Sequence, residues 1–164
     1  MKKIILLILD GFGLSDKENG NAVKNAKKPI LDELMAKYPR VGEVPFDSGR
    51  KMMSTVHEHD GAFVQFTKGA PDEILKKCSH IDVNGEVFEM NDEIRAKIME
   101  ENTRMGNKAL RVFAVAYKNH DVVPTAFDSE SLEYDMTFIG LTGMPCPSYP
   151  PVCTPCTDII QFCQ

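Results

Sequence analysis

The pattern of hydrophobic and polar positions changes near residue 40. Before that point, Ile4–Leu9 is a continuous apolar run rich in β-branched residues. Such a run predicts a strand that is covered on both faces in a parallel sheet. A loop and a helix are expected to follow it, so residues 1–40 predict a strand-loop-helix unit.

Beyond Val41, short stretches alternate between apolar and polar positions and are separated by turn residues, which predicts antiparallel strands. Hairpin turns are expected at Asp47–Arg50, at Asp60-Gly61 and at Asn84-Gly85, the last being the strongest signal of this kind. The predicted strands are Val41–Phe46, Met52–Val56, Ala62–Thr67, His80–Val83, Glu86–Met90, Leu110–Tyr117 and Met136–Leu141.

Two helices are predicted between these strands. The first opens at Pro71, because proline suits the first helical position and acidic residues follow it. The second begins near Asn91, a good N-cap, and carries apolar residues at helical spacing. Residues 41–142 therefore predict an α+β fold, a mainly antiparallel sheet with two helices, and residues 1–40 add an N-terminal strand-loop-helix.

The composition and the net charge of the chain limit the classes of function that we expect for it. Of the 164 residues, 43% are hydrophobic and 26% are charged, which predicts a chain that buries a core. The net charge of -5 gives no electrostatic reason to expect nucleic acid or an anionic membrane surface as a partner. Ile4–Leu9 is too short for a signal peptide or a membrane span, so we expect a soluble chain without a membrane segment.

Asp10 is the first candidate for chemistry, because it ends the predicted apolar strand and is followed by Gly11 and Gly13. Ligands of open α/β sheets bind at that edge, and glycines let the backbone approach a metal or a phosphate closely. The alternative is an ordinary Asp-Gly turn.

An ordered set of motifs runs through the first 40 residues, namely Ile8–Leu14, Gly20–Val23, Pro29–Met35 and Tyr38-Pro39. They resemble the amino terminus of cofactor-independent phosphoglycerate mutases. The resemblance implies an alkaline-phosphatase-like α/β fold with two metal ions, typically manganese, and places a metal ligand at Asp10. The family's serine motif, Gly-Asn-Ser-Glu-Val-Gly-His, does not follow, so manganese is expected at Asp10 only in the complete mutase.

Basic side chains fall at the ends of predicted elements in the second part of the chain. Lys51 follows a hairpin turn, Lys68 ends a strand, and Arg111 begins one after the long helix. Cations at element ends can converge on a phosphate-bearing ligand. Phe46 offers a face on which a base can stack, and Gly69 lets the backbone approach a ligand. The alternative is that Lys51 and Arg111 are solvated and that Phe46 belongs to the core.

Further motifs appear in order through residues 41–144: Val44–Ser54, Phe66–Asp72, Ala109–Val112, Ala114–Tyr117 and Asp135–Leu141. They resemble the second half of the nucleotide-binding domain of P-type cation-transporting ATPases of the calcium-pump type. The resemblance implies that ATP, with Mg²⁺, is the ligand, and that this segment is the cytoplasmic part of a membrane-embedded pump.

The same resemblance implies roles for single residues. Phe46 would stack on adenine, Lys51 and Lys68 would line the nucleotide pocket beside Gly69, and Arg111 would reach the phosphates. Two positions depart from the family pattern: Ser48 stands where an arginine is common, and Asp72 stands where a glutamate is frequent. The first departure is expected to weaken affinity and the second to matter little.

The pump's Asp-Lys-Thr-Gly-Thr loop, its magnesium-binding loops and its membrane helices are not found in this sequence. Phosphoryl transfer requires a positioned nucleophile and metal, so we expect these residues to bind ATP without turning it over.

The last 20 residues differ again. Residues 145–164 are rich in proline and hold four cysteines, Cys146, Cys153, Cys156 and Cys163. We interpret them as a disordered or out-of-frame tail, and the chain as a chimera of a mutase fragment (1–40), an ATPase fragment (41–144) and this tail. The alternative for the cysteines is a zinc-stabilised interaction module.

Overall fold

The computed structural model describes residues 17–145 and 158–160. The predicted strand Ile4–Leu9, the predicted metal ligand Asp10 and the four cysteines of the tail lie outside the described residues.

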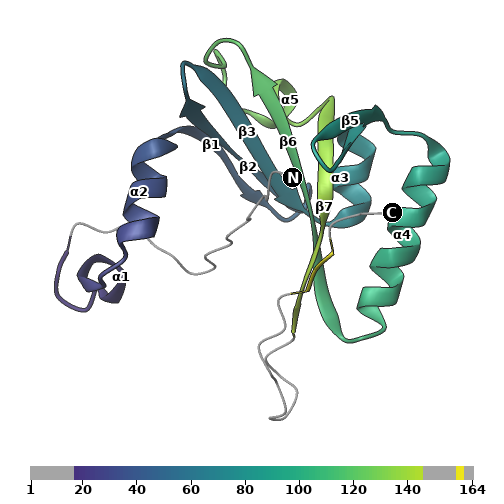
Figure 1. The fold of residues 1–164 in the computed structure, drawn as a ribbon, viewed down its shortest axis with the longest axis horizontal. Helices are drawn as coiled ribbons and strands as arrows, with labels where there is room; N and C mark the ends of the chain where they lie inside the picture. Colours follow the sequence, from purple (N-terminus) through teal and green to yellow (C-terminus); the bar gives the residue numbers. More distant parts are fainter. Residues whose placement is uncertain (1–16, 146–157, 161–164) are drawn as a thin grey trace.

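The described strands form one eight-stranded sheet with the order β1-β2-β3-β6-β7-β4-β5, and β8 also pairs with β7 (Figure 1). Neighbours run antiparallel except for β4 and β7, which run parallel. The strands are β1 (Arg40–Asp47), β2 (Met52–His59), β3 (Ala62–Gly69), β4 (Cys78–Val83), β5 (Glu86–Glu89), β6 (Leu110–His120), β7 (Met136–Pro145) and β8 (Asp158–Ile160). The mainly antiparallel sheet is confirmed, whereas the parallel pair and β8 were not predicted.

The helices are α1 (Ala22–Asn25), α2 (Pro29–Lys37), α3 (Pro71–Lys77), α4 (Asp92–Gly106) and α5 (Ser129–Leu132). Both helices predicted after residue 41 are present as α3 and α4, while the short α5 is a third that the sequence pattern did not indicate. The Asn91 side chain caps α4 by accepting a hydrogen bond from the Ile94 amide at 2.9 Å. None of the described helices is long and apolar enough to cross a membrane.

Two predicted hairpins have the geometry that their sequences demand. Asp60 and Gly61 adopt φ angles of 51° and 80°, and Asn84 and Gly85 adopt 59° and 89°. Two consecutive positive φ angles define the tight turns that match the right-handed twist of paired strands. The turns β2–β3 and β4–β5 are therefore set by local sequence alone.

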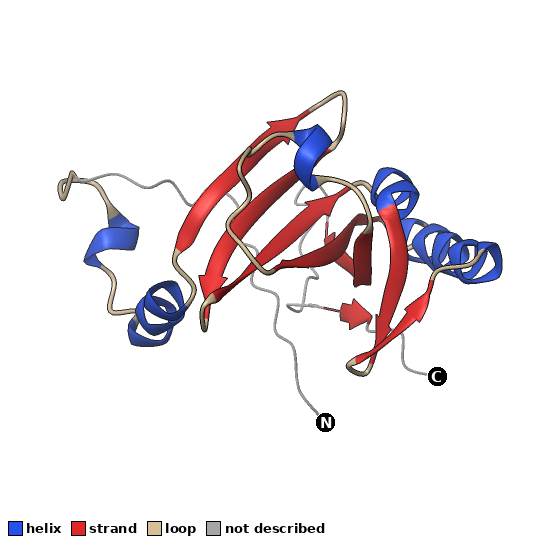
Figure 2. Ribbon diagram, turned by 90° about the horizontal axis from the view of Figure 1, so that it is seen from above, coloured by secondary structure: helices blue, strands red, loops and turns tan. Residues whose placement is uncertain are grey.

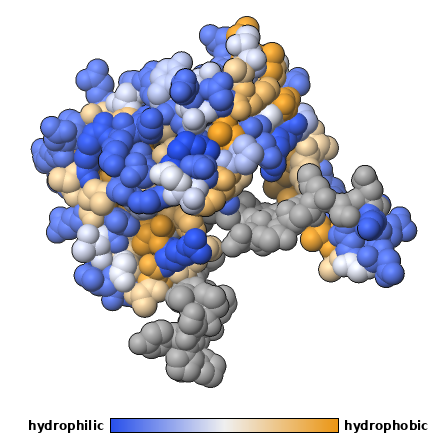
Figure 3. Space-filling model, turned by 180° about the vertical axis from the view of Figure 1, so that it is seen from behind, coloured by the Kyte–Doolittle hydropathy of each residue, from blue (hydrophilic) through white to orange (hydrophobic). Residues whose placement is uncertain are grey.

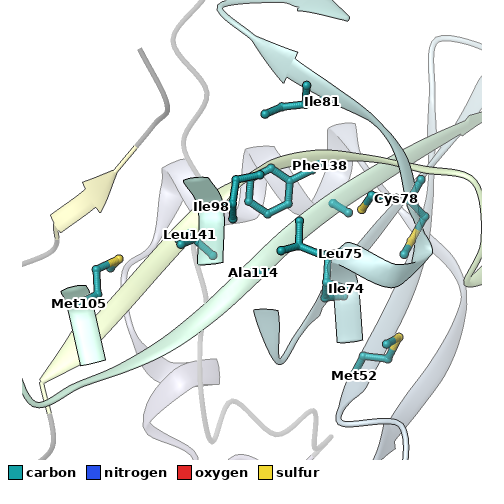
Figure 4. Packing of buried hydrophobic residues seen from close by; sticks show 12 residues of the cluster. Met52, Ile74, Leu75, Cys78, Ile81, Ile98, Met105, Ala114, Phe138 and Leu141 are labelled. Atoms are coloured by element: carbon teal, nitrogen blue, oxygen red, sulfur yellow. The ribbon is translucent and has the colours of Figure 1, made fainter. Parts of the chain in front are cut away.

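A large hydrophobic core lies between the sheet and the helices α3 and α4 (Figure 4). Phe138 of β7, Ile74 of α3 and Ile98 of α4 are fully buried there. We call this set the apolar cluster; its buried members are Met52, Ile74, Leu75, Cys78, Ile81, Ile98, Met105, Ala114, Ala116, Met136, Phe138 and Leu141. Seen from above, α3 and α4 lie together at the right of the curved sheet (Figure 2).

A second buried region lies further along the same sheet face, because Ser54 follows Met52 at the two-residue period of β2. Leu132, the last residue of α5, packs there with Val44 and Val56. Polar side chains accompany them. We call this set the polar cluster; it consists of Arg50, Ser54, Gln65, Thr67 and Glu133, of which all but Arg50 are buried.

The helices α1 and α2 stand apart from the sheet and contain no buried residue (Figures 2 and 3). Ile30 in α2 is 70% exposed. Tyr38, which follows α2, joins it to β2: its ring stacks on His59 at 4.2 Å between centroids, and its carbonyl oxygen lies 2.9 Å from Nδ1 of His57. Contacts of Tyr38 with two histidines of β2 thus attach this part of the chain to the sheet.

Candidate functional site

The predicted binding residues gather at one end of the sheet. The end of β1, the start of β2, the end of β3 and the start of β6 all lie there, because these strands alternate in direction. Phe46, near the end of β1, is 62% exposed. The alternative in which Phe46 belongs to the core is therefore wrong, and its ring is available to a ligand.

Lys51 occupies the turn between β1 and β2, and this turn is ordered by Asp47. The Asp47 carboxylate accepts hydrogen bonds from the amides of Gly49 at 3.0 Å and Arg50 at 2.9 Å. The Lys51 amide donates to the Asp47 carbonyl at 2.7 Å, and Lys51 has a φ of 55°. Non-glycine residues seldom adopt that conformation, so the turn fixes the direction in which the exposed Lys51 leaves the backbone.

Gly69 is required for a close contact between strands, while its approach to a ligand stays a prediction. A Cβ atom at this position would lie 2.5 Å from Cβ of Met52 and 2.6 Å from the Lys51 carbonyl oxygen. The same carbonyl accepts a hydrogen bond from the Ala70 amide at 2.9 Å. The sequence motif that contains Gly69 therefore holds the Lys51 turn against the end of β3.

Lys68 lies on the sheet face opposite the apolar cluster, because it alternates with the buried Gly69. It pairs with Met53 of β2 and Val115 of β6, and it is half-buried. The half-buried Phe66 follows at the same period, opposite Tyr117. A partly covered face of mixed aromatic and basic character thus runs from Lys68 along β3 and β6.

Arg111 lies further out on β6, three residues before Ala114, the partner of Gly69. This separation is about 10 Å along the strand. Arg111 is exposed, and its guanidinium carbon lies 5.2 Å from the centroid of the Phe113 ring. The structure brings Lys51 and Gly69 into contact and places Lys68 beside them, while Arg111 stands at the rim of the same end.

The three basic side chains have no carboxylate partner in the part of the chain that the structure describes. Within residues 17–145, neither Lys51, Lys68 nor Arg111 forms an ion pair with a carboxylate. An anionic ligand that reaches this end of the sheet would meet cations that no neighbouring acid neutralises.

The polar cluster beside the site was not predicted from the sequence. Glu133 is 2% exposed, and Nη1 of Arg50 lies 2.5 Å from each of its carboxylate oxygens. The Ser54 hydroxyl donates to Glu133 at 3.1 Å and lies 2.8 Å from the Thr67 hydroxyl. No sequence signal pointed to this cluster, because Glu133 is about 80 residues from Arg50 and follows a helix too short to show a periodic pattern.

The titratable groups with shifted pKa values lie away from the basic end. Burial raises the pKa of the Cys78 thiol to about 12, so this cysteine is a core residue rather than a nucleophile. Burial also raises the pKa of Tyr117, as does the nearby carboxylate of Asp82, 3.3 Å from its hydroxyl. Burial and the charge of Lys118 lower the pKa of His120.

A resident metal ion has no ready set of ligands in the part of the chain that the structure describes. No group of three or more His, Cys, Asp or Glu side chains gathers there to hold one. The predicted manganese ligand Asp10 and the predicted zinc ligands of the tail fall outside that part.

Known proteins are similar to this sequence over most of its length. It matches the family model described as P-type ATPase, cytoplasmic domain N, over residues 21–148. It is 40% identical over 123 residues to a calcium-transporting ATPase of Listeria monocytogenes, covering 75% of this chain and 14% of the relative. It is 39% identical over 120 residues to calcium-transporting ATPase 1 of Bacillus cereus, covering 73% of this chain and 13% of the relative.

A calcium-transporting ATPase of Bacillus subtilis is 32% identical over 148 residues, which cover 88% of this chain and 16% of the relative. The chain thus spans about a seventh of the length of the curated relatives that it matches.

The family match bears on the segments inferred from the sequence. It begins at residue 21, inside the segment 1–40, and runs across residue 40. None of these comparisons supports the phosphoglycerate mutase resemblance or the chimera, so both stay predictions. Because the match covers more than three quarters of the sequence, this chain belongs to the family of P-type ATPase cytoplasmic N domains.

Proposed function

We propose that this chain is the ATP-binding part of a calcium-transporting P-type ATPase and that it acts on the cytosolic side of the membrane. The observation that carries the proposal is the exposed ring of Phe46 at the same end of the sheet as cations that no described acid neutralises. An aromatic face and unpaired cations are what a nucleotide needs, since its base stacks and its phosphates attract positive charge.

Each residue has a defined part in this proposal. Phe46 stacks on the adenine ring, and Lys51 and Lys68 line the pocket around the ribose and phosphates. Arg111, at the rim, reaches the outer phosphates. Gly69 allows β3 to approach the Lys51 turn as closely as the hydrogen bond from Ala70 requires.

Magnesium bound to the ATP phosphates would screen their negative charge. The side chains of this chain bind and orient the nucleotide. Phosphoryl transfer needs a positioned nucleophile, which we do not assign to any residue here, so ATP is bound without being hydrolysed by these 164 residues. Hydrolysis and calcium transport belong to the whole pump.

Isothermal titration of the purified chain with Mg-ATP tests the proposal. Phe46→Ala is expected to weaken binding by about 5- to 150-fold, the equivalent of 1–3 kcal/mol for one stacked base. Phe88→Ala is the matched control, because Phe88 is also an exposed phenylalanine but lies on β5, at the far edge of the sheet. Absence of ATP binding by the unaltered chain, or equal binding by Phe46→Ala, would overturn the proposal.

A further inference from the structure

The side chain of Arg50 connects the turn that carries Lys51 to a buried carboxylate in the body of the protein. Its Nη2 donates to the Pro45 carbonyl oxygen at 2.8 Å, and its Nη1 lies 2.5 Å from both carboxylate oxygens of Glu133. Pro45 immediately precedes Phe46. The guanidinium therefore links the residues on both sides of the turn to a buried anchor.

That anchor is itself held by hydrogen bonds that run in one direction. Gln65 donates from Nε2 to the Thr67 hydroxyl at 3.0 Å, and the Thr67 hydroxyl lies 2.8 Å from that of Ser54, which donates to Glu133 at 3.1 Å. Each hydroxyl has one proton, so the series is satisfied if it ends on an acceptor. The Glu133 carboxylate is that acceptor, and the series crosses from β3 to β2.

Charge separates Arg50 from the other cations at this end of the sheet. Glu133 is 2% exposed and faces Arg50 with both oxygens, so the positive charge of Arg50 is neutralised locally. Lys51, the next residue, has no such partner among the described residues. Neighbouring cations thus have different surroundings: one faces a buried carboxylate and the other faces solvent.

From these contacts we infer that Arg50 and Glu133 are positioning residues for the nucleotide site: they hold Phe46 and Lys51 in the geometry that binds ATP and do not touch the ligand. The inference rests on the proposed function. Binding is strongest when the groups that contact a ligand are already ordered, because the ligand then has less conformational freedom to remove.

The variant Glu133→Gln tests the inference by the sign of its effect on Mg-ATP affinity. If Arg50 served only as a positive charge, removal of the neighbouring carboxylate would strengthen the binding of an anion. A positioning role predicts the reverse, and we expect affinity to fall about tenfold, which corresponds to 1.4 kcal/mol. Unchanged or tighter binding by Glu133→Gln would overturn the inference.

Hydrogen exchange gives a readout that needs no nucleotide. The amides of Lys51 and Ala70 donate to Asp47 and to Lys51, respectively, and report the order of the turn. We expect both amides to exchange faster in Glu133→Gln. Ser54→Ala removes another hydrogen bond to Glu133 but leaves the ion pair, so it should alter exchange at the turn and ATP affinity less than Glu133→Gln does.

Arg50→Lys provides a second variant, at a partly exposed position and with the positive charge beside Glu133 retained. Lysine keeps the charge but lacks the planar fork that reaches Pro45 and Glu133 together. We expect ATP affinity to fall severalfold, and full retention of binding would contradict positioning. If the unaltered chain binds no ATP, the proposed function fails; if it binds and these variants bind equally well, only the positioning role fails.

Discussion

The two buried regions of this molecule lie on the same sheet face and are built from opposite chemistry. The apolar cluster packs α3 and α4 against the sheet with side chains that form few hydrogen bonds. The polar cluster, under α5, joins its members by hydrogen bonds with defined donors and acceptors. Gln65 lies where they meet, with Nε2 3.7 Å from the sulfur of Met136.

This difference indicates a division of roles. Burial of apolar surface is non-directional and grows with area, so the apolar cluster stabilises the fold without fixing any one side chain. A buried ion pair contributes little net stability, because desolvation offsets its attraction, but it defines a geometry. The polar cluster lies beside the proposed ATP site, where geometry matters more than stability.

The largest effect is expected from emptying the apolar cluster. Phe138→Ala should lower the free energy of unfolding by about 3–5 kcal/mol, because a fully buried ring is lost and a cavity remains. Urea denaturation followed by circular dichroism measures this. Phe88→Ala, at an exposed site, should change stability by less than about 0.5 kcal/mol. Equal losses in the two variants would remove the distinction between core and surface.

The second prediction separates stability from positioning within the polar cluster. Arg50→Met should cost about 3 kcal/mol, because it leaves the buried Glu133 without its cation. The double variant Arg50→Met/Glu133→Leu should regain part of that stability, since apolar pairs replace buried ion pairs well, although it leaves the buried Ser54 hydroxyl without its acceptor. It should nevertheless bind ATP as weakly as the single variant does.

Denaturation curves and ATP titrations of the same protein samples measure both effects. A double variant that recovers its affinity for ATP together with its stability would show that the ion pair has no positioning role.

A smaller loss of stability is expected at the start of α4, a helix that contributes residues to the apolar cluster. Asn91→Ala removes the cap of the Ile94 amide and should cost about 1 kcal/mol without changing ATP affinity. Asn107→Ala, at the other end of the same helix, should cost less, because the backbone amide of Asn107 makes the capping bonds there. Thermal denaturation of the two variants provides the comparison.

The smallest expected effect is the pH dependence of stability that arises from His120, which contacts Gln65 of the polar cluster. The pKa of His120 is lowered by burial and then by the charge of Lys118, and its Nε2 lies 3.0 Å from Oε1 of Gln65. The unfolded chain therefore binds a proton at higher pH than the folded one, and stability should fall as the pH drops below the ordinary histidine value of about 6.5. His120→Gln should make this fall shallower in denaturation midpoints measured between pH 7 and pH 5.

Local features of the fold were predictable from the sequence, and long-range features were not. Asn84-Gly85 and the Asn91 cap act within a few residues, so their outcome does not depend on the rest of the chain. The parallel pair of β4 and β7 brings Cys78 beside Met136, and no local pattern encodes that choice. The helix α5 has four residues, fewer than the period analysis needs.

The candidate site also contains some residues that were predictable from the sequence and others that were not. Family motifs pointed to Phe46, Lys51 and Lys68, and the structure places these residues at one end of the sheet; their contact with ATP stays a prediction. Gly69 was assigned to approach a ligand, yet its closest neighbours are Met52 and the Lys51 carbonyl. Glu133 was not predicted, because its contact with Ser54 of β2 forms only when the chain folds and brings the end of α5 against β2.

The central place of β7 has a consequence for the order in which the protein is made. β7 joins β6 on one side to β4 on the other, so the two parts of the sheet are connected only through it. A nascent chain leaves the ribosome from its amino end, and every element from β1 to β6 emerges before β7 does. Until then β6 has an open edge without its β7 neighbour, and an unpaired strand edge favours aggregation. Chaperone protection should therefore matter most in the interval after β6 has left the ribosome and before β7 has done so.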